Sequence, residues 1–403
     1  MQNTNVVDSS LPMVRLELIS RFISGNGFPV DRQGIEGEKY PFYKVGSLSS
    51  ADREGFLTDT RNSVSDETAA ELGVNIIPSG SIVLAKIGEA VRLLRLAFNK
   101  KDCCIDNNML SIQGDDSKVD SKYLRYCLHT LPINLMINAG PVPSMNMNAL
   151  RDFHIPLLSL ETQQRIADYL DKETGEIDEM IENLEGLVEE LEIRGKSIPK
   201  RLFDSYQSKK YPSTSLTPLW SKVKVQNGFA FSSEQFSPEG EMRIIRISDI
   251  LQNKPLFIRK TDLPDDSFKV SAGNIVIGMS GAGGFNSKIW KGEDAALNQR
   301  VCSLKFSEDE VDAQFLQFSI QPKLDAIFLN QIYTTLPNLS TDQILKLRIF
   351  MPSINEQRLL ASSALRKVEE IDEMISQCSG LIEDLKARRS ALITEVVSGR
   401  KEV

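Results

Sequence analysis

The sequence predicts an α+β protein in which two similar mixed α/β domains are separated by two long helices that form an antiparallel coiled coil. Three observations support this fold class: the chain of 403 residues repeats itself, each repeat ends in a segment with a heptad pattern, and the regions between alternate strand-like runs with turn signals. This length lets two domains each bury a core. We expect a first domain at 1–158, a central helix at 159–205, a second domain at 206–352 and a C-terminal helix at 353–403.

The internal repeat is clearest in the hexapeptide EIDEMI, which occurs at Glu176–Ile181 and again at Glu370–Ile375, 194 residues later. Residues 161–205 share 13 identities in 45 positions with residues 355–399, whereas average residue usage would give about two or three. Fainter matches keep the same order upstream: Asn26-Gly27-Phe28 with Asn227-Gly228-Phe229, Gly80–Val83 with Gly273–Val276, Val119–Tyr126 with Val311–Phe318, and Pro143 with Pro337. The chain is a tandem duplication.

The repeated segments carry a seam of apolar residues spaced alternately by four and three, which is the pattern of a coiled coil. A single such stripe usually docks on its own globular core. Two stripes at equivalent positions, each longer than about 20 residues, favour packing on each other. The seam residues are Ile177, Ile181, Leu184, Val188 and Leu191 in the first copy and Ile371, Ile375, Ile382, Leu385 and Leu392 in the second, with Gly195 and Arg389 at the positions that lack an apolar side chain.

The ends of the two helices are marked by prolines and capping residues. Proline-containing stretches precede both helices, and Ser159 or Asn355 can cap the first turn. Pro199 is expected to end the first helix, and residues 205–218 to form the linker into the second half.

Each variable domain contains short strand-like runs bounded by turn residues. They are KYPFYKVGSL, SIVLAKIG and DCCIDNNMLSI in the first domain and MRIIRISDI, NIVIGMSG and LNQRVCSLKF in the second. A helical stretch follows in each, SKYLRYCLHT or AQFLQFSIQ. We therefore expect both domains to be mixed α+β.

Charge and composition indicate an ordinary cytoplasmic protein. The net charge of −8 is contributed by the two helical segments, with −7 in 159–204 and −1 in 353–403, so the domains are neutral overall and can still carry basic faces. No apolar stretch suggests a membrane span, and the N-terminus lacks the features of a signal peptide. Five cysteines without a CxxC pair favour reduced thiols.

Catalytic, cofactor-binding and metal-binding motifs are not found in the sequence. There is no GxxxxGK[ST] loop, GMSGAGGF at Gly278–Phe285 lacks the third glycine of GxGxxG, and no NPPY or DPPY box occurs. Pro264-Asp265 is not followed by an ExK, and the two histidines, His129 and His154, are expected to be structural. We expect no catalytic residues, no cofactor and no metal in this chain.

The arrangement of these segments resembles the specificity subunit of type I restriction-modification systems (HsdS). The resemblance covers essentially the whole chain and is carried by the proline-to-EQR helix entry, the I-D-x-x-I helix core, the closing R-R-x-A-L-I-x-x-V-x-G at Arg388–Gly399 and the LNQRV turn at Leu297–Val301. Thr162 and Leu158 depart from the usual glutamate and second proline of the first helix entry.

The resemblance implies a role in DNA recognition by a larger complex. Each variable domain would be a target recognition domain that reads one half of a split, asymmetric double-stranded DNA sequence, and the paired helices would hold the two domains apart. It further implies two methylation subunits, which bind S-adenosylmethionine and clasp the helices, and restriction subunits that use ATP and Mg²⁺.

Candidate DNA-contacting residues are the cationic and amide side chains near strand ends, because such groups contact phosphates and base edges. For each of them, ordinary surface charge is the alternative. They are Lys44, Lys86, Arg92 and Arg95 in the first domain and Arg243, Arg246, Lys288, Asn298, Gln299 and Arg300 in the second.

Two other classes of function remain open from the residues themselves. A self-contained DNA-modifying enzyme would methylate or cut DNA without a partner. A coiled-coil adaptor that binds only proteins would give no DNA complex even when its partners are present.

Overall fold

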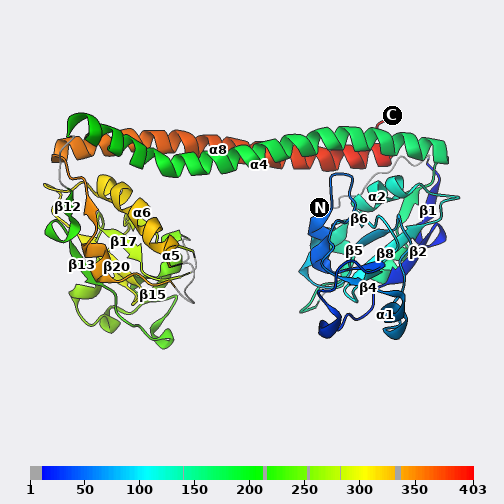
Figure 1. The fold of residues 1–403 in the computed structure, drawn as a ribbon, viewed down its shortest axis with the longest axis horizontal. Coiled ribbons are helices and arrows are strands. Elements are labelled where there is room, and N and C mark those ends of the chain that lie inside the picture. Colours follow the sequence, from blue (N-terminus) through cyan, green and yellow to red (C-terminus); the bar gives the residue numbers. More distant parts are fainter. Residues whose placement is uncertain (1–10, 139, 212–215, 252–254, 282, 332–336) are drawn as a thin grey trace. The chain divides into compact units, whose positions relative to one another are not determined.

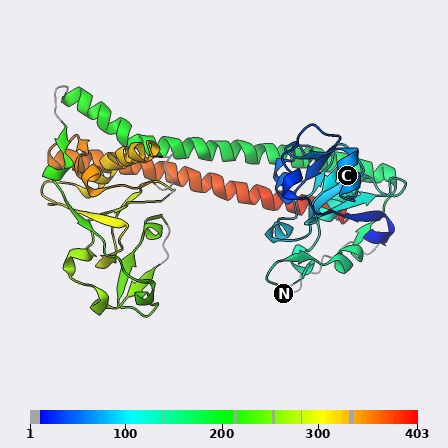
Figure 2. The ribbon, with the colours of Figure 1, turned by 60° about the horizontal axis from the view of Figure 1, so that its bottom comes forward.

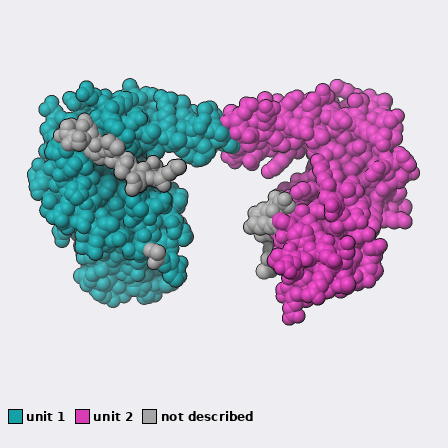
Figure 3. All heavy atoms as spheres, turned by 180° about the vertical axis from the view of Figure 1, so that it is seen from behind, with its two compact units in different colours: residues 1–186, 379–403 teal, residues 187–378 magenta. Residues whose placement is uncertain are grey.

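The computed structural model describes residues 11–138, 140–211, 216–251, 255–281, 283–331 and 337–403. The chain divides into two compact units (Figure 3): unit 1 comprises residues 1–186 and 379–403, and unit 2 comprises residues 187–378. Each unit contains one globular domain and one half of each long helix. The predicted fold class is confirmed.

The domain of unit 1 is built on short strands that form two main sheets (Figure 1). One sheet has the order β2-β8-β5-β6, the other has the order β4-β3-β7, and β1 pairs with β11 and β9 with β10. The strands are β1 (Met13–Arg15), β2 (Ser20–Ser24), β3 (Tyr40–Tyr43), β4 (Ser63–Val64), β5 (Ile82–Ala85), β6 (Ala97–Phe98), β7 (Cys104–Ile105), β8 (Met109–Gly114), β9 (Ile137–Asn138), β10 (Ser144–Met145) and β11 (His154–Pro156).

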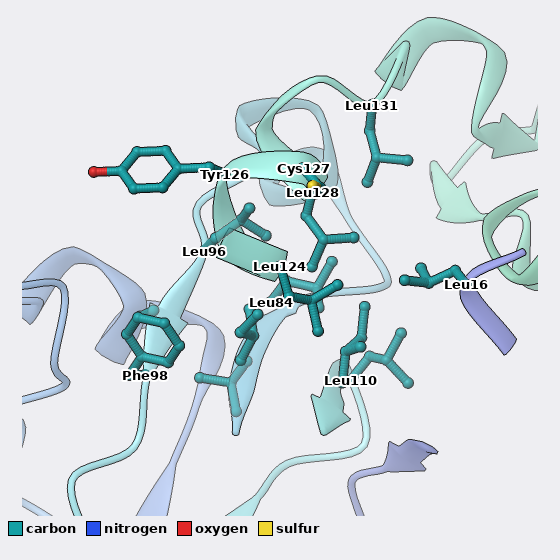
Figure 4. Close-up of a cluster of buried hydrophobic side chains, with 14 of the residues drawn as sticks. Leu16, Leu84, Leu96, Phe98, Leu110, Leu124, Tyr126, Cys127, Leu128 and Leu131 are labelled. Atoms are coloured by element: carbon teal, nitrogen blue, oxygen red, sulfur yellow. The ribbon is translucent and has the colours of Figure 1, made fainter. Parts of the chain in front are cut away.

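Helices of this domain begin at side chains that cap their first turns. They are α1 (Asp66–Glu71), α2 (Ser121–His129) and α3 (Met147–Arg151), and they start after Ser65, Asp120 and Asn146, whose side chains accept backbone N–H groups of the first turn. The apolar face of α2 packs on the sheet, where Leu124 and Leu128 gather with Leu84 of β5 and Leu110 of β8 (Figure 4). Short 3-10 helices span Leu16–Leu18, Val30–Arg32, Val45–Ser50, Glu89–Leu93 and Ile133–Leu135.

The domain of unit 2 repeats this topology. Its sheets have the orders β13-β20-β17-β18 and β15-β14-β19-β16, and β12 pairs with β21. The strands are β12 (Thr217–Pro218), β13 (Lys224–Asn227), β14 (Met242–Ile245), β15 (Leu256–Ile258), β16 (Lys269–Val270), β17 (Ile275–Gly278), β18 (Ser287–Ile289), β19 (Ala295–Leu297), β20 (Val301–Lys305) and β21 (Arg348–Ile349). The helices are α5 (Ile247–Leu251), α6 (Ala313–Leu329) and α7 (Thr341–Leu345), with 3-10 helices at Leu219–Ser221, Ser233–Gln235, Lys260–Asp262 and Asp266–Phe268.

The two domains therefore match strand for strand over most of their length. β2, β8, β5 and β6 of unit 1 correspond to β13, β20, β17 and β18 of unit 2, and β4, β3 and β7 correspond to β15, β14 and β19. Asp120 and Asp312 cap the equivalent helices α2 and α6, and Gly80 and Gly273 adopt positive φ angles of 79° and 87° just before the equivalent strands β5 and β17. The matches at residues 80–83 and 119–126 are thus confirmed.

The central helix α4 spans Leu160–Lys210, so the prediction that Pro199 ends it is wrong. Pro199 is buried, and beyond it Phe203 packs with Phe315 of α6 and Leu360 of α8 in one apolar cluster. Where the end of α4 meets the first turn of α8, Glu356 accepts hydrogen bonds from the Lys210 ammonium and from the hydroxyl groups of Tyr206 and Tyr211. The hydrogen bond from Lys210 contributes most to holding the pKa of Glu356 below its usual range. This tertiary packing offsets the backbone hydrogen bond that a proline removes.

The C-terminal helix α8 spans Ile354–Val397, and its first turn is capped differently from the prediction. The Ser353 hydroxyl and backbone N–H both donate to the Glu356 carboxylate, at 2.6 and 3.0 Å, whereas Asn355 already lies inside the helix. This is a Ser-x-x-Glu arrangement of the capping-box type. For α4, Ser159 accepts the Thr162 N–H at 3.2 Å, as predicted.

Within each unit the two long helices run antiparallel, side by side (Figure 1, Figure 2). In unit 1, Arg389 Nε lies 2.9 Å from Asp178 Oδ1 and Lys386 Nζ lies 3.9 Å from Glu185 Oε1. In unit 2, a Cβ placed on Gly195 would lie 3.3 Å from Cγ2 of Ile371.

The predicted seam residues are all buried or half-buried. Half-burial is expected where only two helices meet, because each covers one side of its partner. Ile177, Leu191, Ile371, Ile382 and Leu385 are buried, and Ile181, Leu184, Val188, Ile375 and Leu392 are half-buried. Among the described helices, none has a segment long and apolar enough to cross a membrane.

Candidate nucleic-acid interface

In unit 1, several chain segments that are distant in the sequence meet where the strands of the two sheets end. The Asp106 N–H donates to the Tyr43 carbonyl at 3.0 Å. The backbone N–H of Lys86 donates to the Asn108 carbonyl at 2.8 Å, and the Met145 N–H donates to the Lys86 carbonyl at 2.8 Å. The loop after β2 joins them, since Asn26 and Asp106 form a parallel bridge. We call these residues, at the ends of β2, β3 and β5 and in the β7–β8 turn, the strand-end surface.

Unit 2 builds the same strand-end surface from equivalent backbone groups. The backbone N–H of Asn298 donates to the Ile245 carbonyl at 3.0 Å. The Met279 N–H donates to the Arg300 carbonyl at 2.9 Å, and the Leu339 N–H donates to the Met279 carbonyl at 2.8 Å. Every donor and acceptor corresponds to one in unit 1. The β19–β20 turn, residues 298–300, is thus the counterpart of the β7–β8 turn, residues 106–108.

Glycines at the start of two loops permit this convergence. A Cβ on Gly25 would lie 1.9 Å from the Asp106 carbonyl oxygen, and a Cβ on Gly228 would lie 2.0 Å from the Asn298 carbonyl oxygen, so only glycine fits at either position. The expected pairing of Asn26-Gly27-Phe28 with Asn227-Gly228-Phe229 is therefore wrong by two residues. The structural constraint falls on Gly25, whose backbone N–H donates to Met109 as that of Gly228 does to Val301.

Of the first-domain candidates, Lys44 and Lys86 belong to the strand-end surface. Both lie near the Asp106 carboxyl, whose pKa is raised by burial. A hydrogen bond from the Asn108 backbone N–H and the charges of the two lysines lower this pKa, but by less than burial raises it. Lys44 also contacts the Gln33 carboxamide, and its ammonium lies 5.7 Å from the centre of the Phe28 ring. The surface in unit 1 thus presents cations beside a carboxylate and two asparagines.

Arg92 and Arg95 are placed elsewhere. Arg92 pairs with Glu89 at 3.2 Å, and Arg95 donates to the Ser49 hydroxyl at 2.8 Å. Arg95 lines a cavity of about 740 Å³ that also borders the long helices through Asp178 and Glu182. It therefore shares a cavity with both long helices, which contribute three carboxylates from α4 and the Arg389 guanidinium from α8.

The second-domain candidates divide into two groups. Asn298, Gln299 and Arg300 form a turn of the strand-end surface in which Asn298 is half-buried and the other two are exposed, and Arg300 donates to the Asn338 side-chain oxygen at 3.3 Å. Arg246 follows β14 as Lys44 follows β3, but its Nε lies 3.0 Å from the fully buried carboxylate of Asp249. Arg243 and Lys288 line a separate cavity.

The Asp106-Asn107-Asn108 turn is not among the candidates that the sequence predicts. The sequence does contain a signal for it, because aligning the strand-containing runs DCCIDNNMLSI and LNQRVCSLKF places Asp106 opposite Asn298. Within the described ranges, no cluster of three or more His, Cys, Asp or Glu side chains is arranged to hold a metal ion.

The chain thus contains two duplicated domains, and each has the same arrangement of strand ends and is joined to one half of the two long helices. Residues 14–192 and 222–377 match the family of type I restriction modification DNA specificity domains, one match in each half. The chain belongs to this family.

Comparison with a curated relative and with solved structures agrees with this assignment. Over 181 residues the chain is 29% identical to the type I restriction enzyme EcoBI specificity subunit of Escherichia coli, a match that covers 45% of this chain and 38% of that subunit. The matched segment thus spans well under half of that relative.

Two solved structures share the fold across almost the whole chain. One comes from work on complex assembly and conformational transition of the type I R-M system, with a TM-score of 0.72 and 14% identity over 97% of this chain and 98% of the other. The HsdS subunit from Thermoanaerobacter tengcongensis gives a TM-score of 0.52 and 13% identity over 98% of both chains.

Proposed function

We propose that each domain reads one half of a bipartite, asymmetric double-stranded DNA target through its strand-end surface, and that the paired helices set the spacing between the halves. The observation that carries this proposal is that one backbone frame occurs twice with different side chains. Lys44 and Lys86 in unit 1 are replaced by Arg246 and Met279 in unit 2, and residues 106–108, DNN, are replaced by residues 298–300, NQR.

Different side chains on one frame select different bases. Arginine pairs with guanine, asparagine and glutamine pair with adenine, and a carboxylate accepts from cytosine. A turn of Asn298, Gln299 and Arg300 therefore favours other bases than a turn of Asp106, Asn107 and Asn108. Two unlike half-sites are the consequence, which makes the whole target asymmetric.

The long helices are the proposed docking site of two methylation subunits. Met180 and Leu187 of α4 are 47% and 43% exposed, and the residues 194 positions later, Met374 and Leu381 of α8, are 49% and 50% exposed. Isolated exposed apolar side chains are common on protein surfaces. Their recurrence at the same positions of both repeats supports a partner that binds the same surface twice.

Catalysis is proposed to belong to the partner subunits. The methylation subunits would bind S-adenosylmethionine and modify the target, and restriction subunits with ATP and Mg²⁺ would carry out cleavage. The role of this chain in such a cytoplasmic complex is to select the DNA sequence.

Co-expression with a methylation subunit, followed by sequencing of methylated chromosomal DNA, tests the proposal. We expect a split motif with two unlike halves. Exchanging residues 298–300 for the DNN of residues 106–108 should alter one half and leave the other unchanged. A contiguous motif, a change in both halves, or methylation by this chain without a partner would contradict the proposal.

A further inference from the structure

A cavity of about 470 Å³ lies on the side of the second domain, between β14, β18 and the start of α6. Lys288 of β18 pairs with Val276, three positions before Met279 of the strand-end surface. A strand rises about 3.3 Å per residue, so the cavity lies about 10 Å from that surface along the strand. It is lined by Arg243, Ser287, Lys288, Ile289, Trp290, Lys291, Gly292, Gln314 and Gln317.

The charge of the lining is positive, because it contains three cationic side chains and no carboxylate. The Arg243 guanidinium lies 5.0 Å from the centre of the Trp290 ring, and the indole is itself held by a 2.7 Å hydrogen bond to the Glu293 carbonyl. Stacking of this kind fixes the plane of a guanidinium. Lys288 and Lys291 are exposed, and within the described parts of the chain neither forms an ion pair with a carboxylate.

Polar donors complete the wall of the cavity. Gln317 donates to the Ser287 carbonyl and hydroxyl oxygens at 3.3 and 3.4 Å, and Gln314 donates to the Gln317 side-chain oxygen at 3.2 Å. The carboxamide nitrogen of Gln314 carries a second N–H. Trp290 donates its backbone N–H to Asn274 of the neighbouring chain segment, so the alternation along the strand directs the N–H of Ile289 away from β17, toward the cavity side.

In the first domain the corresponding strand edge is closed. Phe98 of β6 is the counterpart of Ile289, and it donates its N–H to Gly55 at 2.7 Å and accepts that of Leu57 at 2.8 Å. The Arg125 side chain covers Phe98, with its guanidinium 4.9 Å from the ring centre. Ala97 stands where unit 2 has Lys288. The cationic cavity is therefore a feature of the second domain alone among the described residues.

We propose that this cavity binds a DNA backbone phosphate that flanks the half-site read by the second domain. The inference rests on the proposed function. The major groove is about 12 Å wide, so a loop that enters the groove lies about as far from a flanking phosphate as the strand-end surface lies from the cavity. Phosphate oxygens accept hydrogen bonds from guanidinium, ammonium and backbone N–H groups. The cavity positions the domain on the duplex and carries no sequence information.

The test uses the complete complex of this chain with its methylation subunits and the DNA target found by methylation sequencing. A Lys288→Gln, Lys291→Gln double variant should bind target and non-target DNA about tenfold more weakly, and the slope of log affinity against log salt should fall by about one to two. Lys224→Gln is the matched control and should change neither value. Lys224 is exposed, lies at the end of β13 that is away from the strand-end surface, and forms no ion pair with a described carboxylate.

A series of duplexes, each with one neutral methylphosphonate, locates the phosphate. Neutralising the phosphate at one position should weaken DNA binding by the wild-type complex and have no further effect on binding by the double variant. Thermal unfolding of the double variant checks that the domain is intact. Lys288→Arg, which keeps the charge, should bind DNA with the affinity of the wild type.

Two outcomes overturn the proposal: an unchanged salt slope, or a changed recognition sequence, which would mean that the cavity reads bases. If the wild-type complex shows no preference for any DNA, the proposed function fails instead, so the two failures are distinguishable.

Discussion

The side-chain oxygen of Gln163, in the first turn of α4, accepts the backbone N–H of Asp120 at 2.8 Å, and Asp120 in turn caps α2. The Gln163 amide nitrogen donates to the carbonyls of Lys118 and Leu158 at 3.0 and 2.9 Å. One buried carboxamide therefore ties the long helix to the domain of its own unit.

Unit 2 repeats this joint with the residue 194 positions later. Gln357 accepts the Asp312 N–H at 2.9 Å and donates to the carbonyls of Glu310 and Pro352 at 3.0 and 2.9 Å. Both glutamines are fully buried. A buried carboxamide with three good hydrogen bonds explains why this glutamine is identical in the two repeats.

Gln163→Leu should destabilise unit 1 by about 3 kcal/mol, because three backbone groups lose their partner in a buried place. The adjacent Gln164 is exposed, so Gln164→Leu should change stability by no more than about 0.5 kcal/mol. Denaturant unfolding followed by circular dichroism compares the two variants. Equal effects would show that the joint is not held by this carboxamide.

Two of the glycines in α4, Gly186 and Gly195, should respond in opposite directions to substitution. A Cβ on Gly186 meets no atom within 4 Å, so Gly186→Ala should stabilise the protein by up to about 1 kcal/mol through helix propensity. Gly195 faces Ile371, with a Cβ position 3.3 Å from its Cγ2, and Gly195→Leu should destabilise the helix pair by about 1–3 kcal/mol. Thermal unfolding of both variants measures the two changes in stability. Stabilisation by Gly195→Leu would contradict close packing of α4 on α8 at this position.

Acidification should weaken the first unit through His129. Burial, followed by the charges of Arg389 and Arg125, lowers the pKa of this imidazole from 6.5 to about 3. Below pH 6.5 the unfolded chain binds a proton that the folded chain does not, so stability falls as the pH falls, by up to about 1.4 kcal/mol per pH unit. Urea unfolding at pH 7 and pH 5 measures this loss.

His129→Leu is the matched variant for that measurement, because an apolar side chain at position 129 cannot take up the proton. Its stability should change less than that of the wild type between pH 7 and pH 5. Identical pH profiles would contradict the assignment.

Lengthening α4 tests whether the helices set the spacing of the half-sites. Four inserted residues after Gly186 add about 6 Å of helix, which corresponds to at most about two base pairs of 3.4 Å each. We expect a longer gap between two unchanged half-sites in methylation sequencing. An unchanged gap would refute the spacer role.

Charges placed on the repeated apolar positions test the docking of methylation subunits. Met180→Lys and Met374→Lys should each weaken assembly with one methylation subunit, and the double variant should weaken both. Neither should change the stability of the isolated chain by more than about 0.5 kcal/mol, since both side chains are exposed. Analytical ultracentrifugation of the complex reads the stoichiometry, and full assembly of the double variant would exclude this surface.

Local patterns in the sequence determined the architecture. The heptad spacing of Ile177, Ile181 and Leu184 predicts a helix seam because the helical period repeats every few residues. The duplicated Asp120 and Asp312 identify equivalent helix starts, because a capping side chain acts on the turn that follows it. Such short-range signals revealed the tandem duplication and its paired helices.

Long-range packing decided what these patterns could not. Pro199 remains inside α4 because Phe203 is held in a cluster with α6 and α8, residues distant in sequence. Lys44 and Lys86 lie at one surface, whereas Arg95 lines a cavity that the long helices also border. The sheet topology brings the strand ends together, and no feature of the lysine or arginine itself predicts this. The constraint on Gly25 likewise arises from the Asp106 carbonyl across the sheet. The sequence alone determined which elements form, and the tertiary structure decided which side chains converge.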